Sequence, residues 1–407
     1  MEALKGLRVL DLAWIVAGSM LTRYLADHGA TVIKVESATR PDLVRTTPPY
    51  RDGKAGWNRS VYHGNFSANK LGMTLNLSHP QAREVARRLL GWAEVVVENF
   101  TPGVMDRLGL GYEQARQVNP SLIMLSISSQ GQTGPHAHHP GVGLLNGALL
   151  GFFNTGWPDR ETPIFYGAYL DVLAPRLGVA ALMAALDYRD RTGQGQHLDL
   201  SQLEVGVHFL APLVLDYFTS GREPQKVGNA DEAAAPHNAY PCAGDNPGHP
   251  GDRWCAIACF SDGQWQALAR EAGHPEWAQD SRFITLEDRK RHEAELDELV
   301  ASWTRTLPAY EVMERLQRAG VPAGVVADGQ DLHEDPQLRS RGHFTVVEHP
   351  ETGPTSYDIP GFRLSLTPGR VERPAPCLGE HTEGVLREVL GLSDQEFAEL
   401  LASGALD

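Results

Sequence analysis

The sequence has little cysteine, and it lacks the glycine patterns that mark several common enzyme classes. No Gly-x-Gly-x-x-Gly follows the first predicted strand, which disfavours a nicotinamide or flavin site. Gly-x-Ser-x-Gly, the nucleophile motif of serine α/β-hydrolases, is also absent. The cysteines are too few and too unevenly spaced for a disulfide framework, so we expect a reducing, cytoplasmic setting. The four of them are Cys242, Cys255, Cys259 and Cys377.

Positive charge and long apolar runs are scarce as well. The chain of 407 residues has 36 Lys and Arg against 51 Asp and Glu, a formal net charge of -15. Nucleic-acid binding needs a basic surface, so we expect no nucleic-acid partner, although local basic residues can still hold a small anion. The longest nearly apolar stretch, about Gly141–Phe153, is shorter than the roughly 20 residues that span a bilayer. The N-terminal residues show no signal-peptide pattern. We therefore expect a soluble protein without membrane attachment.

The sequence does contain an alternation of strands and helices. Asn99, Phe100 and Thr101 directly follow one of the strands. The alternation predicts an α/β domain with a parallel sheet, and such sheets bind ligands at the carboxyl ends of their strands. Strands are predicted at Arg8–Leu12, Ala30–Glu36, Glu94–Glu98 and Ser121–Ser126, with helices at Met20–His28 and Pro80–Trp92.

The second half of the chain changes in composition. A long helix is predicted at Ala174–Asp190, with Pro175 in its first turn, and another at Gln202–Thr219. The segment Gly221–Gly251 is rich in Gly, Pro, Asn and Ala, which indicates a loop at a domain change. A strand at Trp254–Ala258 and polar helices after it predict a smaller second domain.

Two clusters of metal-binding residue types have a plainer interpretation. His136, His138 and His139 lie in a Gly/Pro-rich segment without Cys or carboxylate at ligand spacing. Cys255 and Cys259 lack the two further ligands that a zinc site needs, so buried free thiols are the better interpretation. We expect no metal site.

Asp171 is the strongest single candidate for chemistry. It ends the run YGAYLD, directly ahead of the long predicted helix. The commoner role for Asp at such a place is a plain N-cap. The alternative is a carboxylate nucleophile, kept ionised by the helix dipole and screened from water by Phe165, Tyr166, Tyr169 and Leu170.

Several stretches together resemble the class III CoA transferases, the family that includes formyl-CoA transferase and carnitine CoA transferase. The resemblance covers nearly the whole chain, and the combination of stretches is specific although no single stretch is. They are Gly6–Glu36, Val97–Tyr112, Ser126–Pro135 and Asp171–Gln196, supported by Ala319–Val325, Asp335–Gly342 and Ala375–His381.

The resemblance implies a mechanism and a set of contacts. The family's catalytic aspartate falls on Asp171, fixed by an ungapped run to RDRTGQGQ. That aspartate exchanges CoA between carboxylic acids through an anhydride and an aspartyl-CoA thioester, without ATP or a permanently bound cofactor; acyl-CoA and acid are substrates. The family's CoA contacts fall on Val16, Ala17, Leu75, Asn76, Ser78, Asn99, Phe100, Thr101, Arg107 and His139. A surface helix position is the plainer role of Arg107.

The resemblance also implies an architecture. A Rossmann-like large domain would be built from both chain ends, about 1–220 and 331–407, and residues 221–330 would form a smaller α+β domain. Two chains would interlock as a dimer, either two identical copies or a heteromer with a related subunit.

The chain departs from the family pattern at several positions. Val16 replaces a Gln of formyl-CoA transferases, and Ala38 replaces an Arg, with Arg40 nearby. Gly143 replaces an acidic residue, and Pro175 replaces a glycine. These departures argue against a formyl/oxalate substrate pair.

The same fold hosts 2-methylacyl-CoA racemases, which need two acid/base groups. Their histidine falls on Val142, which cannot move a proton, so CoA transfer is favoured. A non-catalytic CoA-binding subunit is a third hypothesis, and the presence of Asp171 argues against it.

Aromatic residues close to Asp171 in sequence bear on the substrate. They fill a core or line an apolar pocket for a bulky acid. The local pattern is similar to transferases that use succinyl-CoA to activate aromatic succinates such as benzylsuccinate. The residues are Phe152, Phe153, Trp157, Phe165, Tyr166 and Tyr169.

Overall fold

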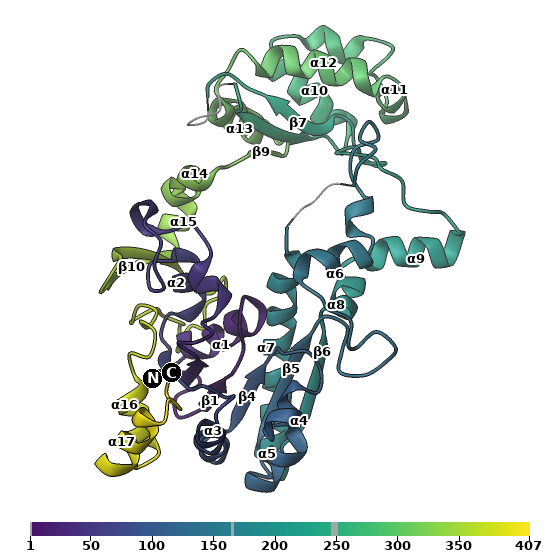
Figure 1. Cartoon of the computed structure of the whole chain (residues 1–407). Helices are drawn as coiled ribbons and strands as arrows, with labels where there is room; N and C mark the ends of the chain where they lie inside the picture. Colours follow the sequence, from purple (N-terminus) through teal and green to yellow (C-terminus); the bar gives the residue numbers. More distant parts are fainter. Residues whose placement is uncertain (1, 164–166, 246–250) are drawn as a thin grey trace. The chain divides into compact units, whose positions relative to one another are not determined.

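The structure is a computed structural model that describes residues 2–163, 167–245 and 251–407. It divides into two compact units. The first unit comprises Met1–Phe153, Phe165–Arg222 and Ser340–Asp407, and the second comprises Asn154–Ile164 and Glu223–Arg339. Both ends of the chain thus belong to the first unit (Figure 1). The division into domains at 1–220, 221–330 and 331–407 stays a prediction.

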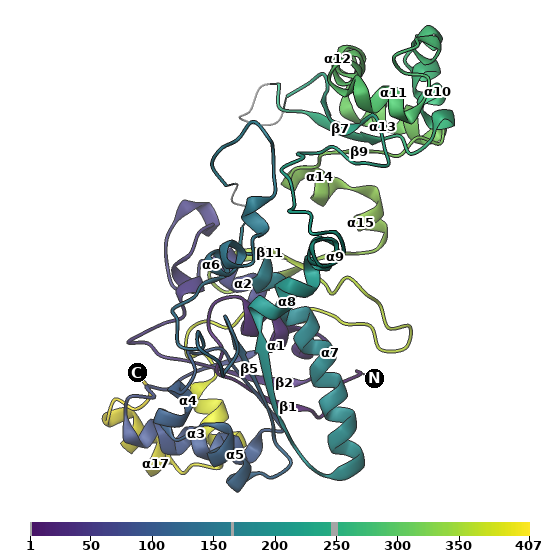
Figure 2. The ribbon, with the colours of Figure 1, turned by 90° about the vertical axis from the view of Figure 1, so that its right-hand side faces the viewer.

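A six-stranded parallel sheet forms the centre of the first unit (Figures 1 and 2). Its order is β3-β2-β1-β4-β5-β6, the order of the Rossmann fold, in which the strand order reverses between β1 and β4. The predicted parallel sheet in an α/β unit is therefore confirmed. The strands are β1 (Arg8–Asp11), β2 (Thr31–Glu36), β3 (Leu71–Thr74), β4 (Val95–Glu98), β5 (Ile123–Ser128) and β6 (His197–Ser201).

Apolar residues cover both faces of the central strands. In β4, for example, Val96 packs in one core cluster, while Val95 and Val97 pack in the other. Such strands form because β-branched residues suit a pleated surface that is buried on both sides.

Helices pack on the two faces of this sheet. Leu21 and Leu25 of α1 (Ala17–Asp27) and Leu182 of α7 (Tyr169–Thr192) share one cluster with alternate residues of β1, β4 and β5. On the other face, α3 (Pro80–Trp92) and α5 (Tyr112–Val118) share a cluster with the C-terminal segment. The remaining helical segments before residue 222 are η1 (Leu43–Thr46), η2 (Arg51–Gly53), α2 (Val61–Ser67), α4 (Val104–Leu108), α6 (Gly143–Leu149), η3 (Phe152–Asn154), α8 (Gln202–Phe209) and α9 (Ala211–Ser220).

The C-terminal segment completes this unit. Thr382 Oγ1 accepts a hydrogen bond from Thr74 N–H of β3 at 3.0 Å, and the Ala405 carbonyl accepts one from Asn76 N–H at 2.9 Å. Residues more than 300 positions apart therefore share one core. The segment contains β10 (Phe344–His349), β11 (Gly353–Asp358), α16 (Thr382–Gly384), the π-helical η5 (Val385–Val389) and α17 (Asp394–Ala402).

The second unit has its own core around a three-stranded antiparallel sheet, ordered β7-β8-β9. Trp265, Leu296 and Val312 are fully buried in its cluster. Its strands are β7 (His237–Pro241), β8 (Trp254–Ala258) and β9 (Ala323–Val325), and its helices are α10 (Asp262–Glu271), η4 (Pro275–Gln279), α11 (Leu286–Arg291), α12 (Glu293–Thr304), α13 (Ala309–Arg318) and α14 (Gly329–Glu334); α15 (Pro336–Ser340) crosses the unit boundary.

Two predicted helices differ from the structure. The long helix α7 begins at Tyr169, so Pro175 lies inside it rather than in its first turn. The helix predicted at Gln202–Thr219 is two helices, α8 and α9, which meet at Leu210. Pro212 falls in the first turn of α9, where a missing N–H costs nothing.

Within the described residues, α7 is the one helix long and apolar enough to cross a membrane by length and composition. With 24 residues, this helix is longer than the apolar stretch at about Gly141–Phe153. A core helix of a globular protein passes the same test, and α7 packs against α1, α6, α8, β5 and β6.

Candidate active site

A cavity of about 140 Å³ lies at the carboxyl ends of the central strands. The segments after β1, β4, β5 and β6 each contribute to its wall, and α7 contributes Asp171. This is the edge where a doubly wound sheet binds ligands, next to the reversal between β1 and β4. The lining residues are Ile15, Val16, Ala17, Asn99, Phe100, Thr101, Pro102, Ile127, Ser128, Ser129, Ala137, His139, Gly141, Val142, Gly143, Asp171 and Gln202.

The loops after β1 and β4 are tied to each other. Asn99 Nδ2 donates to the Trp14 carbonyl at 2.7 Å, and Asn99 Oδ1 accepts from Trp14 N–H at 2.8 Å. The ring of Trp14 also meets the ring of Phe100 edge to face at 5.8 Å. Asn99 therefore fixes the loop after β1 through both ends of its amide.

Asp171 is the third residue of α7 and not its N-cap. The N-cap position is Ala168, which has no side-chain cap. The Asp171 carboxylate is instead directed at Gln202, whose Nε2 donates to Oδ1 at 2.7 Å. Burial raises the pKa of Asp171, and the hydrogen bond from Gln202 opposes that rise.

A second amide orients Gln202. Asn146 Nδ2 donates to Gln202 Oε1 at 2.8 Å, and both side chains are buried. A carboxylate only accepts hydrogen bonds, so Asp171 requires the NH₂ group of Gln202 to face it. The Gln202 carbonyl must then face Asn146. The ionised carboxylate thus determines the orientation of both amides.

Gly143 leaves the space that the carboxylate occupies. A Cβ at this position would lie 2.3 Å from Asp171 Oδ2 and 2.6 Å from its Cγ. Any side chain at Gly143 therefore displaces the carboxyl group. Asp171 can occupy its present position because Gly143 stands where the family resemblance predicts an acidic residue.

The family of the chain follows from comparison with known proteins. Residues 4–382 match the model of a family described as CoA-transferase family III. The chain belongs to this family.

Relatives of this CoA transferase match it over nearly their whole length. The succinyl-CoA–D-citramalate CoA-transferase of Chloroflexus aurantiacus is 34% identical over 98% of this chain and 97% of its own. The succinate–glutarate CoA-transferase of Agrobacterium fabrum is 35% identical, covering 95% of each chain. A crystal structure of a CAIB/BAIF family protein from Brucella suis is similar with a TM-score of 0.86 and 32% identity, covering 95% of this chain and 99% of that one.

The cavity brings together seven of the eleven residues predicted for the site: Val16, Ala17, Asn99, Phe100, Thr101, His139 and Asp171.

Four predicted CoA contacts lie outside the cavity. Leu75 is buried in the core, and Asn76 and Ser78 form the turn after β3. Arg107 lies exposed on α4, and no ion pair involves it among the described residues. The roles of all these residues stay predictions.

Of the aromatic residues expected near Asp171, the structure describes Phe152, Phe153, Trp157 and Tyr169. Phe152 meets Tyr169 at 5.6 Å and Phe209 at 6.0 Å, both edge to face. Trp157 belongs to the second unit and lies beside Arg160. None of the described members of the predicted set lines the cavity. Phe165 and Tyr166 lie outside the described residues.

Three residues at the site are not among those predicted from the sequence. Gln202 and Asn146 hold Asp171 from α8 and α6. Tyr62 of α2 packs against Val16, Val44 and Phe66; burial raises the pKa of its phenol, and the charge of Asp171 adds to the rise. Gln202 alone carried a sequence signal, because it directly follows a strand that ends at the ligand edge.

Across residues 2–163, 167–245 and 251–407, no group of three or more His, Cys, Asp and Glu is placed to hold a metal ion. The rings of His136 and His139 lie 4.6 Å apart without a carboxylate or thiol beside them.

Proposed function

We propose that Asp171 is the nucleophile that exchanges CoA between two carboxylic acids. The observation that carries this proposal is the Asp171 carboxylate in the cavity at the carboxyl edge of the sheet, held by Gln202. A family III CoA transferase needs one activated carboxylate, and this one is partly desolvated, with one oxygen hydrogen-bonded and the other beside Gly143.

The reaction is a series of acyl exchanges. An Asp171 oxygen attacks the thioester carbon of the donor acyl-CoA, and the C–S bond breaks to release CoA thiolate and leave a mixed anhydride. The thiolate attacks the Asp171 carbonyl carbon, which gives an aspartyl-CoA thioester and the free donor acid. The acceptor carboxylate displaces CoA to form a second anhydride. The thiolate then attacks the acceptor's carbonyl carbon and regenerates Asp171.

The cavity fits the reacting end of these substrates. At about 140 Å³ it is smaller than ligand pockets of roughly 300–1,000 Å³. The thioester and acid would therefore enter it, and the rest of CoA would lie along the adjoining loops. Arg107, exposed on α4 and without an ion pair in the described part of the chain, has a guanidinium that suits a CoA phosphate.

We propose succinyl-CoA as donor and a small dicarboxylic acid as acceptor. Both curated relatives described above are named for succinyl-CoA or succinate, and for citramalate or glutarate as the other acid. A bulky aromatic acid such as benzylsuccinate is the second candidate, with less support because none of the described aromatic residues of the predicted set lines the cavity. A panel of both acid types, read by the mass of the acyl-CoA products, distinguishes the two.

We also propose an interlocked dimer, of two copies or of one copy with a related subunit. Apolar side chains on α8 and α9 support a partner, because Phe209, Leu215 and Phe218 are all exposed, Phe218 by 84%. Light scattering of the purified chain gives its mass in solution, and a monomer contradicts the two-copy form.

The test of the nucleophile is Asp171→Ala. We expect the rate of CoA exchange to fall by at least about 10³-fold while the far-ultraviolet circular dichroism spectrum is unchanged. Asp187→Ala is the matched control, since Asp187 lies on the same helix but pairs with Arg191 at the surface, 2.8 Å away. Hydroxylamine added during turnover should mark Asp171 as a hydroxamate in peptide mass spectra.

Near-normal turnover of Asp171→Ala contradicts the mechanism. Change of stereochemistry at the carbon next to the thioester, without CoA exchange, would instead support a racemase.

A further inference from the structure

Six charged side chains are buried together beneath the loop that follows β1. Three are acidic and three are basic, and each is at most 2% exposed. Buried ion pairs are weak sources of stability because desolvation offsets their attraction. Stability alone therefore does not explain why these six charges are buried beside the cavity. They are Asp11, Lys34, Glu36, Asp42, Arg45 and Lys70.

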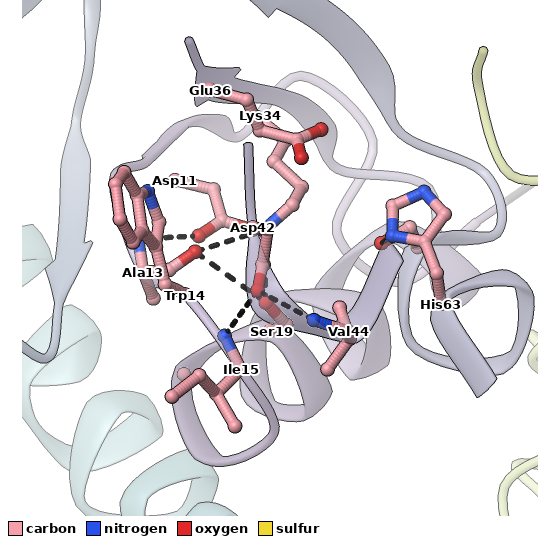
Figure 3. Close-up of polar contacts among 12 residues, drawn as sticks. Asp11, Ala13, Trp14, Ile15, Ser19, Lys34, Glu36, Asp42, Val44 and His63 are labelled. Carbon is pink, nitrogen blue, oxygen red and sulfur yellow. Dashed lines mark hydrogen bonds and ion pairs between the residues drawn. The ribbon is translucent and has the colours of Figure 1, made fainter. Parts of the chain in front are cut away.

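Lys34 joins the loop to this cluster. Its Nζ donates to the Ala13 carbonyl at 2.8 Å, to Ser19 Oγ at 3.0 Å and to Asp42 Oδ2 at 3.0 Å. An ammonium group has three hydrogens, so these three acceptors satisfy it completely. One of the three is a backbone group of the loop itself (Figure 3).

Asp42 holds the next part of the loop. Its Oδ1 accepts from Ile15 N–H at 2.8 Å and from Val44 N–H at 3.2 Å, while Oδ2 pairs with Lys34. Figure 3 shows Asp42 between the Lys34 ammonium and the backbone of Ile15.

Ile15 has a backbone conformation that its side chain disfavours. Its φ is +61°, in the left-handed region that β-branched residues rarely adopt. Such strain persists only where the surroundings impose it, and it gathers at ligand sites. Here the hydrogen bond from Ile15 N–H to Asp42 fixes the strained residue, and the next residues, Val16 and Ala17, line the cavity.

We propose that Asp42 and Lys34 are positioning residues for acyl-CoA binding: they hold residues 13–15 in the strained conformation that places Val16 and Ala17 in the cavity wall. The inference rests on the proposed function of that cavity. The position of Asp171 does not depend on residues 13–15: Gln202 donates a hydrogen bond to its carboxylate, and Gly143 leaves room for it. Loss of the Asp42 contact should therefore affect binding of acyl-CoA more than the chemical step.

The first test is Asp42→Asn, which keeps the side-chain shape and removes the charge. We expect KM for the acyl-CoA donor to rise about tenfold and kcat to stay within about threefold, the pattern of lost uniform binding. Glu36→Gln is the matched control. Glu36 pairs with Arg45 at 2.7 Å, equally buried in the same cluster, and its carboxylate makes no contact with residues 13–15 among the described residues. It should lower the thermal midpoint without moving KM.

A second test addresses the backbone of Ile15. Glycine adopts positive φ without strain, whereas alanine does not. In the Asp42→Asn background, Ile15→Gly should give an at least about threefold lower KM than Ile15→Ala. With Asp42 intact the two variants should agree within about twofold, because Asp42 then imposes the conformation on either residue.

Three outcomes overturn the inference: an unchanged KM in Asp42→Asn, an equal rise in Glu36→Gln, or no difference between glycine and alanine in the Asp42→Asn background. If Asp42→Asn does not fold, the paired replacement Lys34→Met with Asp42→Leu removes both charges and must show the same rise in KM. Failure of the proposed function is read separately, from near-normal turnover of Asp171→Ala.

Discussion

Gln202→Leu tests how the protein keeps Asp171, the proposed nucleophile, ionised. Leucine keeps about the same volume but removes the donor that lies 2.7 Å from Asp171 Oδ1. Burial already raises the pKa of Asp171, and the bond from Gln202 is the one opposing influence on it. Without this bond the pKa should rise further, and the protonated carboxyl cannot attack a thioester.

The size of the change follows from the hydrogen bond. A hydrogen bond to a charged group contributes about 1.5–3 kcal/mol, and 1.36 kcal/mol corresponds to one pKa unit. The acidic limb of kcat/KM should therefore move up by about 1–2 pH units. At pH values below this limb, kcat/KM of the variant should fall in proportion to the ionised fraction of Asp171. Well above it, the carboxylate is ionised in both proteins, and their kcat/KM values should approach each other.

The assay is the pH dependence of kcat/KM for acyl-CoA formation, measured by chromatography of the products. Gln114→Leu is the control, because Gln114 is exposed on α5 and away from the cavity. An acidic limb that stays in place, or moves to lower pH, refutes the role assigned to Gln202. Asn146→Leu should move the limb in the same direction but less, since it removes only the group that orients Gln202.

Two further predictions follow from the packing. Gly143→Ala should lower kcat about 100-fold with the fold retained, because the new Cβ displaces the Asp171 carboxyl; Gly361→Ala, which meets open space, is the control. Glu98→Gln should stabilise the protein by about 3 kcal/mol at pH 8.5 in urea unfolding, since burial raises the Glu98 pKa from 4.5 to about 7.

The sign of the Glu98 prediction follows from the direction of that pKa. Below about pH 4.5 the carboxyl is neutral in both folded and unfolded chains, so the substitution should change little there. As pH rises from about 4.5 to about 7, the wild-type chain loses stability, because the unfolded state gives up the Glu98 proton while the folded state keeps it; the variant has no such loss. A variant no more stable than wild type at pH 8.5 contradicts the prediction.

Much of the sheet could be predicted from the sequence. The strands β1, β2, β4 and β5 are apolar runs bounded by turns, so periodicity and composition suffice for them. The edge strands β3 and β6 were missed. LGMT contains a glycine and is short, and HLDLS alternates polar and apolar residues because it is only half buried. The alternation in β6 is itself a strand signal.

The candidate site was predictable only in part. Asp171 and the Asn99–Thr101 segment stand at recognisable places, a helix start and a strand end. Gln202 lies 31 residues from Asp171, and Asn146 lies 56 residues from Gln202, so their contacts depend on how β5, β6 and α7 are arranged. No local pattern encodes that arrangement.

Residues that hold the loop after β1 have roles that the sequence does not reveal. Asn99, Asp42 and Lys34 each make a hydrogen bond to the backbone of residues 13–15. A sequence motif cannot distinguish a side chain that binds a ligand from one that holds the loop which binds it, because both are polar residues near a strand end. Asn99 illustrates this: it lines the cavity, yet both ends of its amide bond to Trp14. The predicted contact of Asn99 with CoA would therefore use the second hydrogen of its amide nitrogen or the second lone pair of its oxygen, because Trp14 takes one of each.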